Sequence, residues 1–525
     1  MLTAPATREE ITINPWIIAI AVMLGTFMEV LDTTIVNVSL PHISGSLGAT
    51  VDESTWVLTS YLVANAIILP MTGWLANQFG RKRILMLSIG GFTVASVLCG
   101  MAPNLTILLI CRIVQGMAGG GLQPLSQAIM LEAFPPQQRG RAMAFWGLGI
   151  VVAPMLGPVL GGWITDSYSW RWLFYINLPV GIVGLVLSYM FIFDPHYIQR
   201  ARGRVDYWGI GLLAVGMGAL QVMLDKGQED DWFSSRFIQV LLILTIISLA
   251  AFLINELARE HPIVDLRVFR FRTYASGVFI MTVIGFVLYG SIVLVPIFLQ
   301  TLLGYSALDA GYAMLPRGLG AFIGLPIVGL LVNKVEPRRL LVAGMVAASA
   351  SLWLLGGLNL NAGYWDIFWA QLLQGFAMGF VFVPLTTVTH DPVPKEQMGN
   401  ATSIFNVMRN IGSSAGIAVT TTVVARATQA NINVLGRNVT QYGSATQQMM
   451  HSATGLFVSK GGAPGAVGGA SDQAYAAVFG IVAKQAAMLA DIHAFRLLAI
   501  IFAAIIPLVL VMKRPRHRSG PAGMH

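Results

Sequence analysis

Long apolar segments separated by short polar connections run through the whole 525-residue chain. Each is close to the length of about 20 residues that a helix needs to cross the hydrocarbon core of a bilayer. The apolar runs are continuous and do not alternate at every second position, which excludes a transmembrane β-barrel. We therefore expect an all-α integral membrane protein with fourteen transmembrane helices, near residues 15–38, 55–78, 84–101, 106–131, 142–165, 172–193, 207–224, 237–255, 275–301, 309–332, 340–359, 365–389, 403–426 and 494–512.

Basic residues are distributed unevenly between the connections. If the N-terminus is cytoplasmic, most of the Lys and Arg residues outside the spans fall in inner connections, and the outer ones hold only Arg171, Lys226, Arg236, Arg437, Lys460 and Lys484. Because positive side chains are retained on the cytoplasmic side, this asymmetry predicts that both termini are cytoplasmic. The chain is 55% hydrophobic and only 11% charged, so its net charge of +8 reflects membrane topology and gives no reason to expect a nucleic-acid partner.

An internal repeat divides the chain. "GWLANQFGRKRIL" from Gly73 aligns with "GLLVNKVEPRRLL" from Gly329, and "RIVQGMAGGG" from Arg112 aligns with "QLLQGFAMGF" from Gln371. Parallel repeats of this kind predict two six-helix bundles that move against each other around a central site. We expect the six plus two plus six arrangement of a major facilitator fold, with an N-terminal bundle at 1–193, two extra linker helices at 194–273 and a C-terminal bundle at 274–525.

One connection is much longer than the others. Residues 427–493 are polar, rich in small residues and interrupted by "KGGAPGAVGGASD", so we expect a long periplasmic loop there. Such a loop is either a flexible linker or a docking surface for a partner.

Two acidic residues lie inside the first apolar segment. Glu29 and Asp32 are three residues apart and therefore share one face of a helix. A charged carboxylate at the bilayer centre costs about 2.5–3.5 kcal/mol on insertion scales, which marks such residues as functional. Arg112, in the fourth segment, lies at a similar depth, so it can meet Asp32 if the first and fourth segments adjoin, as they do in facilitator folds. Either the acids bind and release protons as this partner comes and goes, or the ion pair is a static clamp.

Other charges and small residues mark further candidate positions. Arg317 and Arg409 are candidate cavity charges, although Arg409 is close enough to the inner surface to reach it. The fifth segment reads "GLGIVVAPMLGPVLGGWI" from Gly147, and its small residues four apart predict either close helix packing or a hinge that closes the pore. The cytoplasmic turn after the second segment holds a compact motif made of Gly73, Gly80, Arg81 and Arg83.

No pattern in the sequence predicts an enzyme. The chain has no Walker loop for ATP, no cluster of His and Cys for a metal, and no nucleophile with a suitably spaced base. We therefore expect a secondary active transporter that uses an ion gradient, with the proton as coupling ion, and has neither cofactor nor metal. A membrane receptor or channel fits poorly, because the repeat and the basic inner turns have no role in a static pore.

Several motifs together resemble one family. "LDTTIVNVSLP", "GWLANQFGRKR", "RIVQGMAGGG", "GPVLGG" and "WRWLFYINLP" resemble the fourteen-span drug:proton antiporters of the major facilitator superfamily. The resemblance implies multidrug efflux of hydrophobic toxic compounds, and hence antibiotic resistance, driven by protons that enter across a bacterial inner membrane. It also implies a periplasmic adaptor resembling EmrA and an outer-membrane channel resembling TolC.

The resemblance also implies roles for individual residues. The residues matched by Asp32 and Arg112 serve proton coupling in the family, and the motif matched by Gly157, Pro158, Gly161 and Gly162 marks antiporters. This chain departs from the family at Asn77, where an aspartate is common, so Arg81 and Arg83 need other partners or serve only topology. The motifs do not separate drug export from export of one endogenous metabolite, such as a siderophore.

Overall fold

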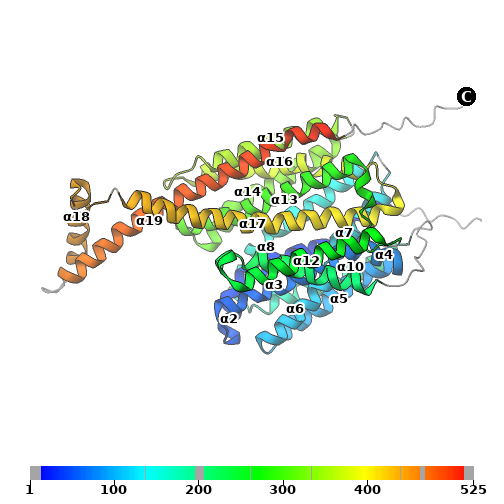
Figure 1. The fold of residues 1–525 in the computed structure, drawn as a ribbon, viewed down its shortest axis with the longest axis horizontal. Coiled ribbons are helices and arrows are strands. Elements are labelled where there is room, and N and C mark those ends of the chain that lie inside the picture. Colours follow the sequence, from blue (N-terminus) through cyan, green and yellow to red (C-terminus); the bar gives the residue numbers. More distant parts are fainter. Residues whose placement is uncertain are drawn as a thin grey trace, which may run out of the picture.

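Helices that lie side by side along the long axis build the molecule (Figure 1). The computed structural model describes residues 14–135, 137–194, 206–260, 262–332, 334–437, 439–440, 442–461 and 467–512, and this part of the chain contains helices and no strand. Thirteen of its helical segments are long and apolar enough to cross a membrane, and they include every predicted span except the one at 403–426. The chain is therefore a multi-pass, all-α membrane protein, as predicted.

The helices follow one another in the predicted order. The N-terminal bundle contains α1 (Pro15–Ile35), α2 (Leu40–Leu47), α3 (Val51–Ile68), α4 (Thr72–Phe79), α5 (Arg81–Met101), α6 (Leu105–Gly119), α7 (Leu122–Ala133), α8 (Arg139–Ser167), α9 (Trp172–Tyr175) and α10 (Asn177–Phe191). The linker helices are α11 (Tyr207–Lys226) and α12 (Arg236–Ala258). The C-terminal bundle contains α13 (Arg272–Ile297), α14 (Ala307–Leu331), α15 (Pro337–Leu355), α16 (Tyr364–His390), α17 (Met398–Gly436), α18 (Ser444–Gly461) and α19 (Val467–Ala504).

The remaining predicted span lies inside α17. This helix of 39 residues is long enough to cross a bilayer but falls short in apolarity, so the count of fourteen stays a prediction. The domain boundaries also stay predictions, and so do the cytoplasmic termini, which lie outside the described residues.

The prediction of a long loop at 427–493 is wrong in its local structure. Residues up to Gly436 continue α17, α18 follows, and α19 begins at Val467. For α19, the alanine-rich sequence from Ala474 onward explains the helix, because alanine has the highest helix propensity and outweighs the scattered glycines. Figure 1 shows α18 and the adjoining ends of α17 and α19 projecting beyond the bundle, at the end opposite the C-terminus. The periplasmic position of this extension stays a prediction.

Polar side chains of α17 connect the C-terminal bundle to the N-terminal bundle and to the linker helices. Asn406 donates to Gln127 of α7 at 2.6 Å, and Ser414 donates to Gln221 of α11 at 3.1 Å. Further along, Thr422 accepts from the indole of Trp232 at 2.8 Å. These residues lower the apolarity of α17, and every one of them has a partner on another element. A buried polar group in lipid or protein needs such a partner, so α17 is stable as an internal helix.

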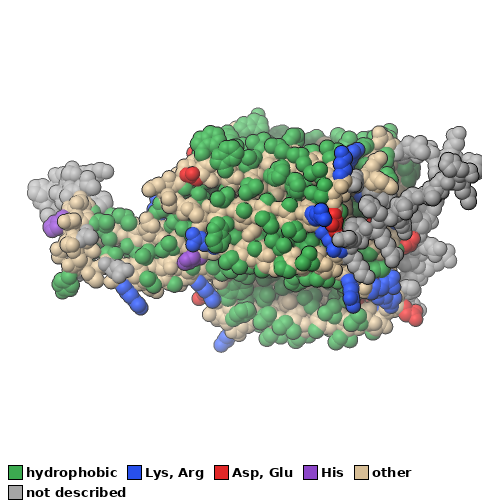
Figure 2. Space-filling model, turned by 90° about the horizontal axis from the view of Figure 1, so that it is seen from above, with side chains coloured by type: hydrophobic (Ala, Val, Ile, Leu, Met, Phe, Trp, Pro, Cys, Tyr) green, Lys and Arg blue, Asp and Glu red, His purple; other side chains and the backbone are tan. Residues whose placement is uncertain are grey.

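The surface fits a lipid environment. Figure 2 shows hydrophobic side chains across the body of the visible face and Lys and Arg side chains mainly toward its ends. Most of α12 is exposed on the surface of the structure. Its exposed large apolar side chains include Ile243, Ile246, Ile247 and Leu253. Exposed apolar bands of this extent are expected where lipid, in place of water, surrounds the protein.

Candidate functional site

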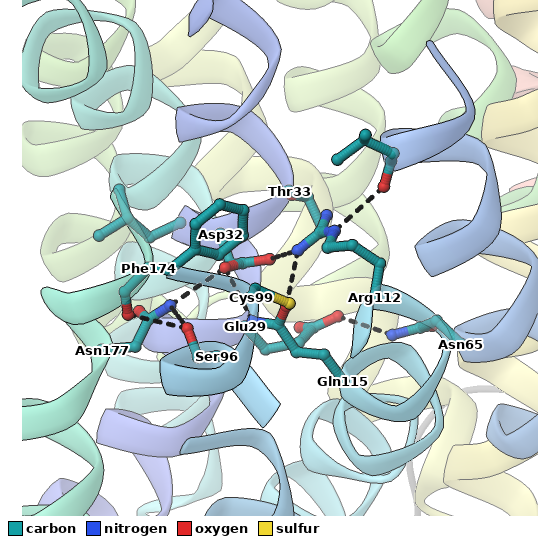
Figure 3. A network of polar contacts seen from close by, with 12 residues as sticks. Glu29, Asp32, Thr33, Asn65, Ser96, Cys99, Arg112, Gln115, Phe174 and Asn177 are labelled. Atoms are coloured by element: carbon teal, nitrogen blue, oxygen red, sulfur yellow. Dashed lines mark hydrogen bonds and ion pairs between the residues drawn. The ribbon is translucent and has the colours of Figure 1, made fainter. Parts of the chain in front are cut away.

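Asp32 and Arg112 meet in the middle of the N-terminal bundle. Nη1 of Arg112 on α6 donates to the Asp32 carboxylate of α1 at 2.5 Å, and both side chains are fully buried. The guanidinium also donates through Nε to the carbonyl of Val57 on α3 at 3.0 Å. Figure 3 shows the pair at the centre of a polar network. The contact expected from the depths of the two residues is therefore present.

Amide side chains complete the surroundings of Asp32. Gln115 and Asn177 each donate to Oδ1 of the carboxylate at 3.0 Å, from α6 and α10 respectively (Figure 3). The Arg112 guanidinium lies over the Tyr61 ring, with its central carbon 4.3 Å from the ring centroid. Asp32 is thus held by one cation and two amides, which is the dense set of donors that a buried carboxylate needs to remain charged.

Glu29 lies one turn away in different surroundings. It is 3% exposed and accepts two hydrogen bonds, from Asn65 of α3 at 3.1 Å and from Gln123 of α7 at 2.6 Å. Among the described residues it forms no ion pair. The two acids of α1 therefore differ in kind: Asp32 has a fixed countercharge, whereas Glu29 has only neutral donors.

Gln123 connects Glu29 to the other bundle. Its amide nitrogen donates to Glu29, and its amide oxygen accepts from the guanidinium of Arg409 on α17. Arg409 is 6% exposed, so it is a buried cation of the interface and does not reach the inner surface. One side chain thus joins an acid of the N-terminal bundle to a cation of the C-terminal bundle.

The glycine and proline motif lies on α8 beside the acids. A Cβ atom added at Gly157 would lie 2.2 Å from the hydroxyl of Thr34, and one at Gly161 would lie 2.7 Å from the carbonyl of Ile35. Pro158 is inside the helix, and a Cβ atom at Gly162 would meet open space. The first two glycines therefore allow α8 to contact α1 directly after Asp32. Close packing is thus present, and the hinge role of the motif stays a prediction.

The cytoplasmic turn motif contacts several elements. A Cβ atom at Gly73 would lie 2.7 Å from the backbone of Asn400, so α4 and α17 touch across the two bundles. Gly80 has a φ of 95°, which favours glycine, and its Cβ position faces Asp194.

The two arginines of this motif differ in their surroundings. Arg81 is buried and forms an ion pair with Glu132, which supplies the partner that Asn77 cannot, and Arg83 is exposed.

Arg317 is the remaining candidate charge, and it lies apart from the acids. It belongs to α14 in the C-terminal bundle, is 3% exposed, and its Nη1 and Nη2 atoms have no hydrogen-bond partner among the described residues. The structure therefore gathers Glu29, Asp32, Arg112 and Arg409 into one region and leaves Arg317 in another.

Sequence reasoning missed the amides. Asn65, Gln115, Gln123 and Asn177 all bind an acid of α1, yet none was singled out from the sequence. A signal was present, because each is a buried or half-buried amide within an apolar segment, where polar groups need partners. The partner of each amide depends on which helices lie side by side, and the spacing of residues along the chain does not give this.

Comparison with known proteins identifies the family. Residues 22–417 match the family model described as Major Facilitator Superfamily, which is more than half of the chain. The chain belongs to the major facilitator superfamily. It is accordingly a transporter and not an enzyme.

Relatives of known name support this assignment. The chain is 39% identical over 437 residues to the "Multidrug export protein EmrB" of Haemophilus influenzae, covering 83% of this chain and 85% of the relative. It is 36% identical over 504 residues to the "Fatty acid resistance protein FarB" of Neisseria gonorrhoeae, and the alignment covers 96% of this chain and 97% of that relative. The crystal structure of the human organic anion transporter MFSD10 has the same fold, with a TM-score of 0.57 at 14% identity, covering 93% of this chain and 100% of that one.

We expect Gly157→Ala to disturb the contact between α1 and α8. Its methyl group would collide with Thr34, and overpacking of this kind typically costs 1–3 kcal/mol. The melting temperature of the purified protein should fall, and transport should fall with it. Gly162→Ala is the matched control, since open space receives its methyl group. Equal losses in both variants would show that the α1 contact is not what matters.

We expect Gln123→Leu to change the pH dependence of transport, because leucine cannot donate to Glu29 or accept from Arg409. Gln127→Leu is the control on the same helix: it removes an amide bridge from α7 to α17, through Asn406, that does not involve Glu29. Each change leaves a buried polar group without its partner, so stability should fall by about 1–3 kcal/mol in both. Only Gln123→Leu should move the midpoint of the pH profile measured in proteoliposomes. Identical profiles for the two variants would contradict the link to Glu29.

Proposed function

We propose that this protein is a proton-coupled multidrug efflux transporter that exports hydrophobic toxic compounds by alternating access. The observation that carries the proposal is the arrangement of two buried acids with different partners, one of which is joined through Gln123 to a cation of the opposite bundle. Protonation of Glu29 would therefore alter the contact between Gln123 and Arg409, which joins the bundles. An ion gradient can drive movement of the bundles only if protonation changes the relative stability of their arrangements.

The direction and the cargo of transport rest on the relatives. A relative named for multidrug export and another named for fatty acid resistance both align over most of this chain. We infer that the cargo is apolar and chemically varied, and that it leaves the cell across a bacterial inner membrane. Export of one endogenous metabolite would use the same coupling and would differ only in the range of compounds carried.

The coupling step follows from the chemistry of a carboxyl group. A charged Glu29 only accepts hydrogen bonds, so Gln123 turns its nitrogen toward Glu29 and its oxygen toward Arg409. A protonated Glu29 donates one hydrogen bond. When that proton faces Gln123, the amide accepts it by turning over, which presents an N–H group to Arg409. Two donors then face each other, the contact between α7 and α17 is lost, and the bundles are free to separate.

Asp32 supplies the second step. Its ion pair with Arg112 holds α1 against α6 while the carboxylate is charged. When Asp32 binds a proton, the attraction between these two groups is lost, and only hydrogen bonds hold them together. The residues that follow Asp32 pack against Gly157 and Gly161 of α8. A shift of α1 is therefore passed directly to the helix that lies against α14 of the other bundle.

The partners are part of the proposal. The extension formed by α17, α18 and α19 beyond the bundle offers a helical surface to a periplasmic adaptor resembling EmrA (Figure 1). Through such an adaptor, an outer-membrane channel resembling TolC would carry the exported compounds out of the cell. The family resemblance is the basis for naming these two partners.

We expect Asp32→Asn to abolish transport driven by a pH gradient while the binding of substrate survives. Because the single change leaves Arg112 as an unpaired buried cation, it should destabilise the protein by about 3–5 kcal/mol. The double variant Asp32→Asn/Arg112→Gln removes both charges and should recover much of that stability without recovering transport. Export of a lipophilic dye from proteoliposomes, with and without an uncoupler, measures coupling. Vigorous export by the double variant under a pH gradient would refute a coupling role for Asp32.

A panel of lipophilic compounds in the same assay tests the range of cargo. Resistance of a sensitive strain to many unrelated compounds, lost when the proton gradient is collapsed, is the expected result. Export that persists after collapse would refute antiport, and resistance to a single compound class would favour a metabolite exporter.

A further inference from the structure

The C-terminal bundle contains a position related by the internal repeat to the ion pair of the N-terminal bundle. Arg112, Gln115 and Gly116 on α6 align with Gln371, Gln374 and Gly375 on α16. The packing repeats as well. A Cβ atom at Gly116 would lie 2.3 Å from the carbonyl oxygen of Tyr61 on α3, and one at Gly375 would lie 1.7 Å from the carbonyl oxygen of Arg317 on α14. Arg317 therefore takes the place that Tyr61 has in the first bundle.

The hydrogen bonds repeat in the same way, but the charges do not. Gln115 donates to the Asp32 carboxylate at 3.0 Å, and Gln374 donates to the Ser291 hydroxyl at 3.0 Å. A hydroxyl on α13 thus replaces the carboxylate on α1. The cation is kept but has moved from α6 to α14, the counterpart of α3. The second bundle therefore has the cation of this arrangement without its anion.

Arg317 has no internal countercharge in the described part of the chain. Both of its terminal nitrogens lack a hydrogen-bond partner, and no ion pair with an acid is found. An uncompensated buried charge is strongly unfavourable, so its retention points to an anion supplied from outside the chain.

Neighbouring amides are also left with free hydrogen-bonding groups. Gln371 is fully buried, and among the described residues neither its nitrogen nor its oxygen has a hydrogen-bond partner; the same holds for Oε1 of Gln374. Gln371 lies one helical turn before Gly375, at the level where α16 contacts Arg317. Arg317 and Gln371 thus supply a guanidinium and an amide N–H₂ group at neighbouring levels of α14 and α16, and this donor set suits a carboxylate.

The surroundings are apolar and belong to both bundles. A Cβ atom at Gly318 would lie 2.7 Å from the sulfur of Met155, and one at Gly311 would lie 3.7 Å from Val159, both of which are on α8. On the α16 side, Gly320 and Gly324 pack against the backbone of Leu372 and Phe376. Arg317 therefore lies where α8 of the N-terminal bundle meets the C-terminal bundle, beside side chains that suit an alkyl chain.

We propose that Arg317 and Gln371 form an anion subsite of the transport pathway, which binds the carboxylate of an amphipathic substrate whose apolar tail lies between α8 and α14. The subsite rests on the proposed function, since it names one substrate class for that pathway. The first bundle uses its buried cation to hold an internal acid, and the second uses its cation to hold the acid of the cargo.

Paired ligands test the subsite. Dodecanoate and dodecan-1-ol have the same tail and differ in the head group, and their binding to purified protein in detergent can be measured by calorimetry at pH 8. Arg317→Gln should weaken the binding of dodecanoate about 10- to 100-fold, the range expected for a lost charge-assisted hydrogen bond. Binding of dodecan-1-ol should change less than twofold. Arg317→Lys should give an intermediate result, because it keeps the charge and loses the planar fork.

Controls separate the subsite from a structural role. Arg236→Gln removes an exposed arginine at the start of α12 and should leave both affinities unchanged. Without ligand, Arg317→Gln should leave the melting temperature unchanged or raise it, because it removes an unpaired buried charge. A large fall in that temperature would reveal a structural countercharge and overturn the proposal. Equal losses for dodecanoate and dodecan-1-ol would overturn it as well, and so would binding of acetate as tight as that of dodecanoate.

The proposed function can fail separately. If Arg317→Gln binds dodecanoate as tightly as the wild type, the subsite is refuted. If the same variant also exports a neutral lipophilic dye under a pH gradient, proton-coupled export stands. If the wild-type protein exports the dye equally well without a gradient, proton coupling is refuted, whatever the binding measurements show.

Discussion

A buried ion pair in a medium without water is the constraint on which the rest of the structure depends. Asp32 and Arg112 are completely shielded, so neither could remain charged without the other and without the amides around them. To bring these donors to one carboxylate, α1, α6 and α10 must come together, and α3 must present a backbone carbonyl to the guanidinium. The order of the N-terminal bundle can thus be understood as the set of contacts that makes one charged pair tolerable.

The two bundles share the same close helix packing but have different charged side chains at the related positions. Glycines at matching positions of α6 and α16 allow close contact with the backbones of α3 and α14, so the backbone frame is preserved. The side chains on that frame have diverged: one bundle has an acid paired with its cation, and the related position of the other has Arg317, which forms no ion pair with any described residue. Under the proposed function, this common frame with different charges would let one protein handle an ion and a cargo at separate places.

The sequence predicted those features that depend on one helix or on a comparison of depths. Glu29 and Asp32 share a face because three residues nearly complete one helical turn, and Arg112 could be matched to Asp32 because both are expected at a similar depth in the membrane. The role of Gln123 could not be predicted, since its two partners belong to α1 and α17, far apart in the chain. The prediction of a loop at 427–493 is wrong for a local reason, because the helix propensity of the alanines in α19 outweighs that of the glycines.

The polar character of α17 has a consequence for biogenesis. Its partners lie on α7, on α11 and at Trp232, all of which are synthesised earlier. A segment with so little preference for lipid gains stability only when those side chains are already in the bilayer to receive it. We therefore expect this late segment to insert against helices already in the membrane, and misplaced early helices should impair its insertion.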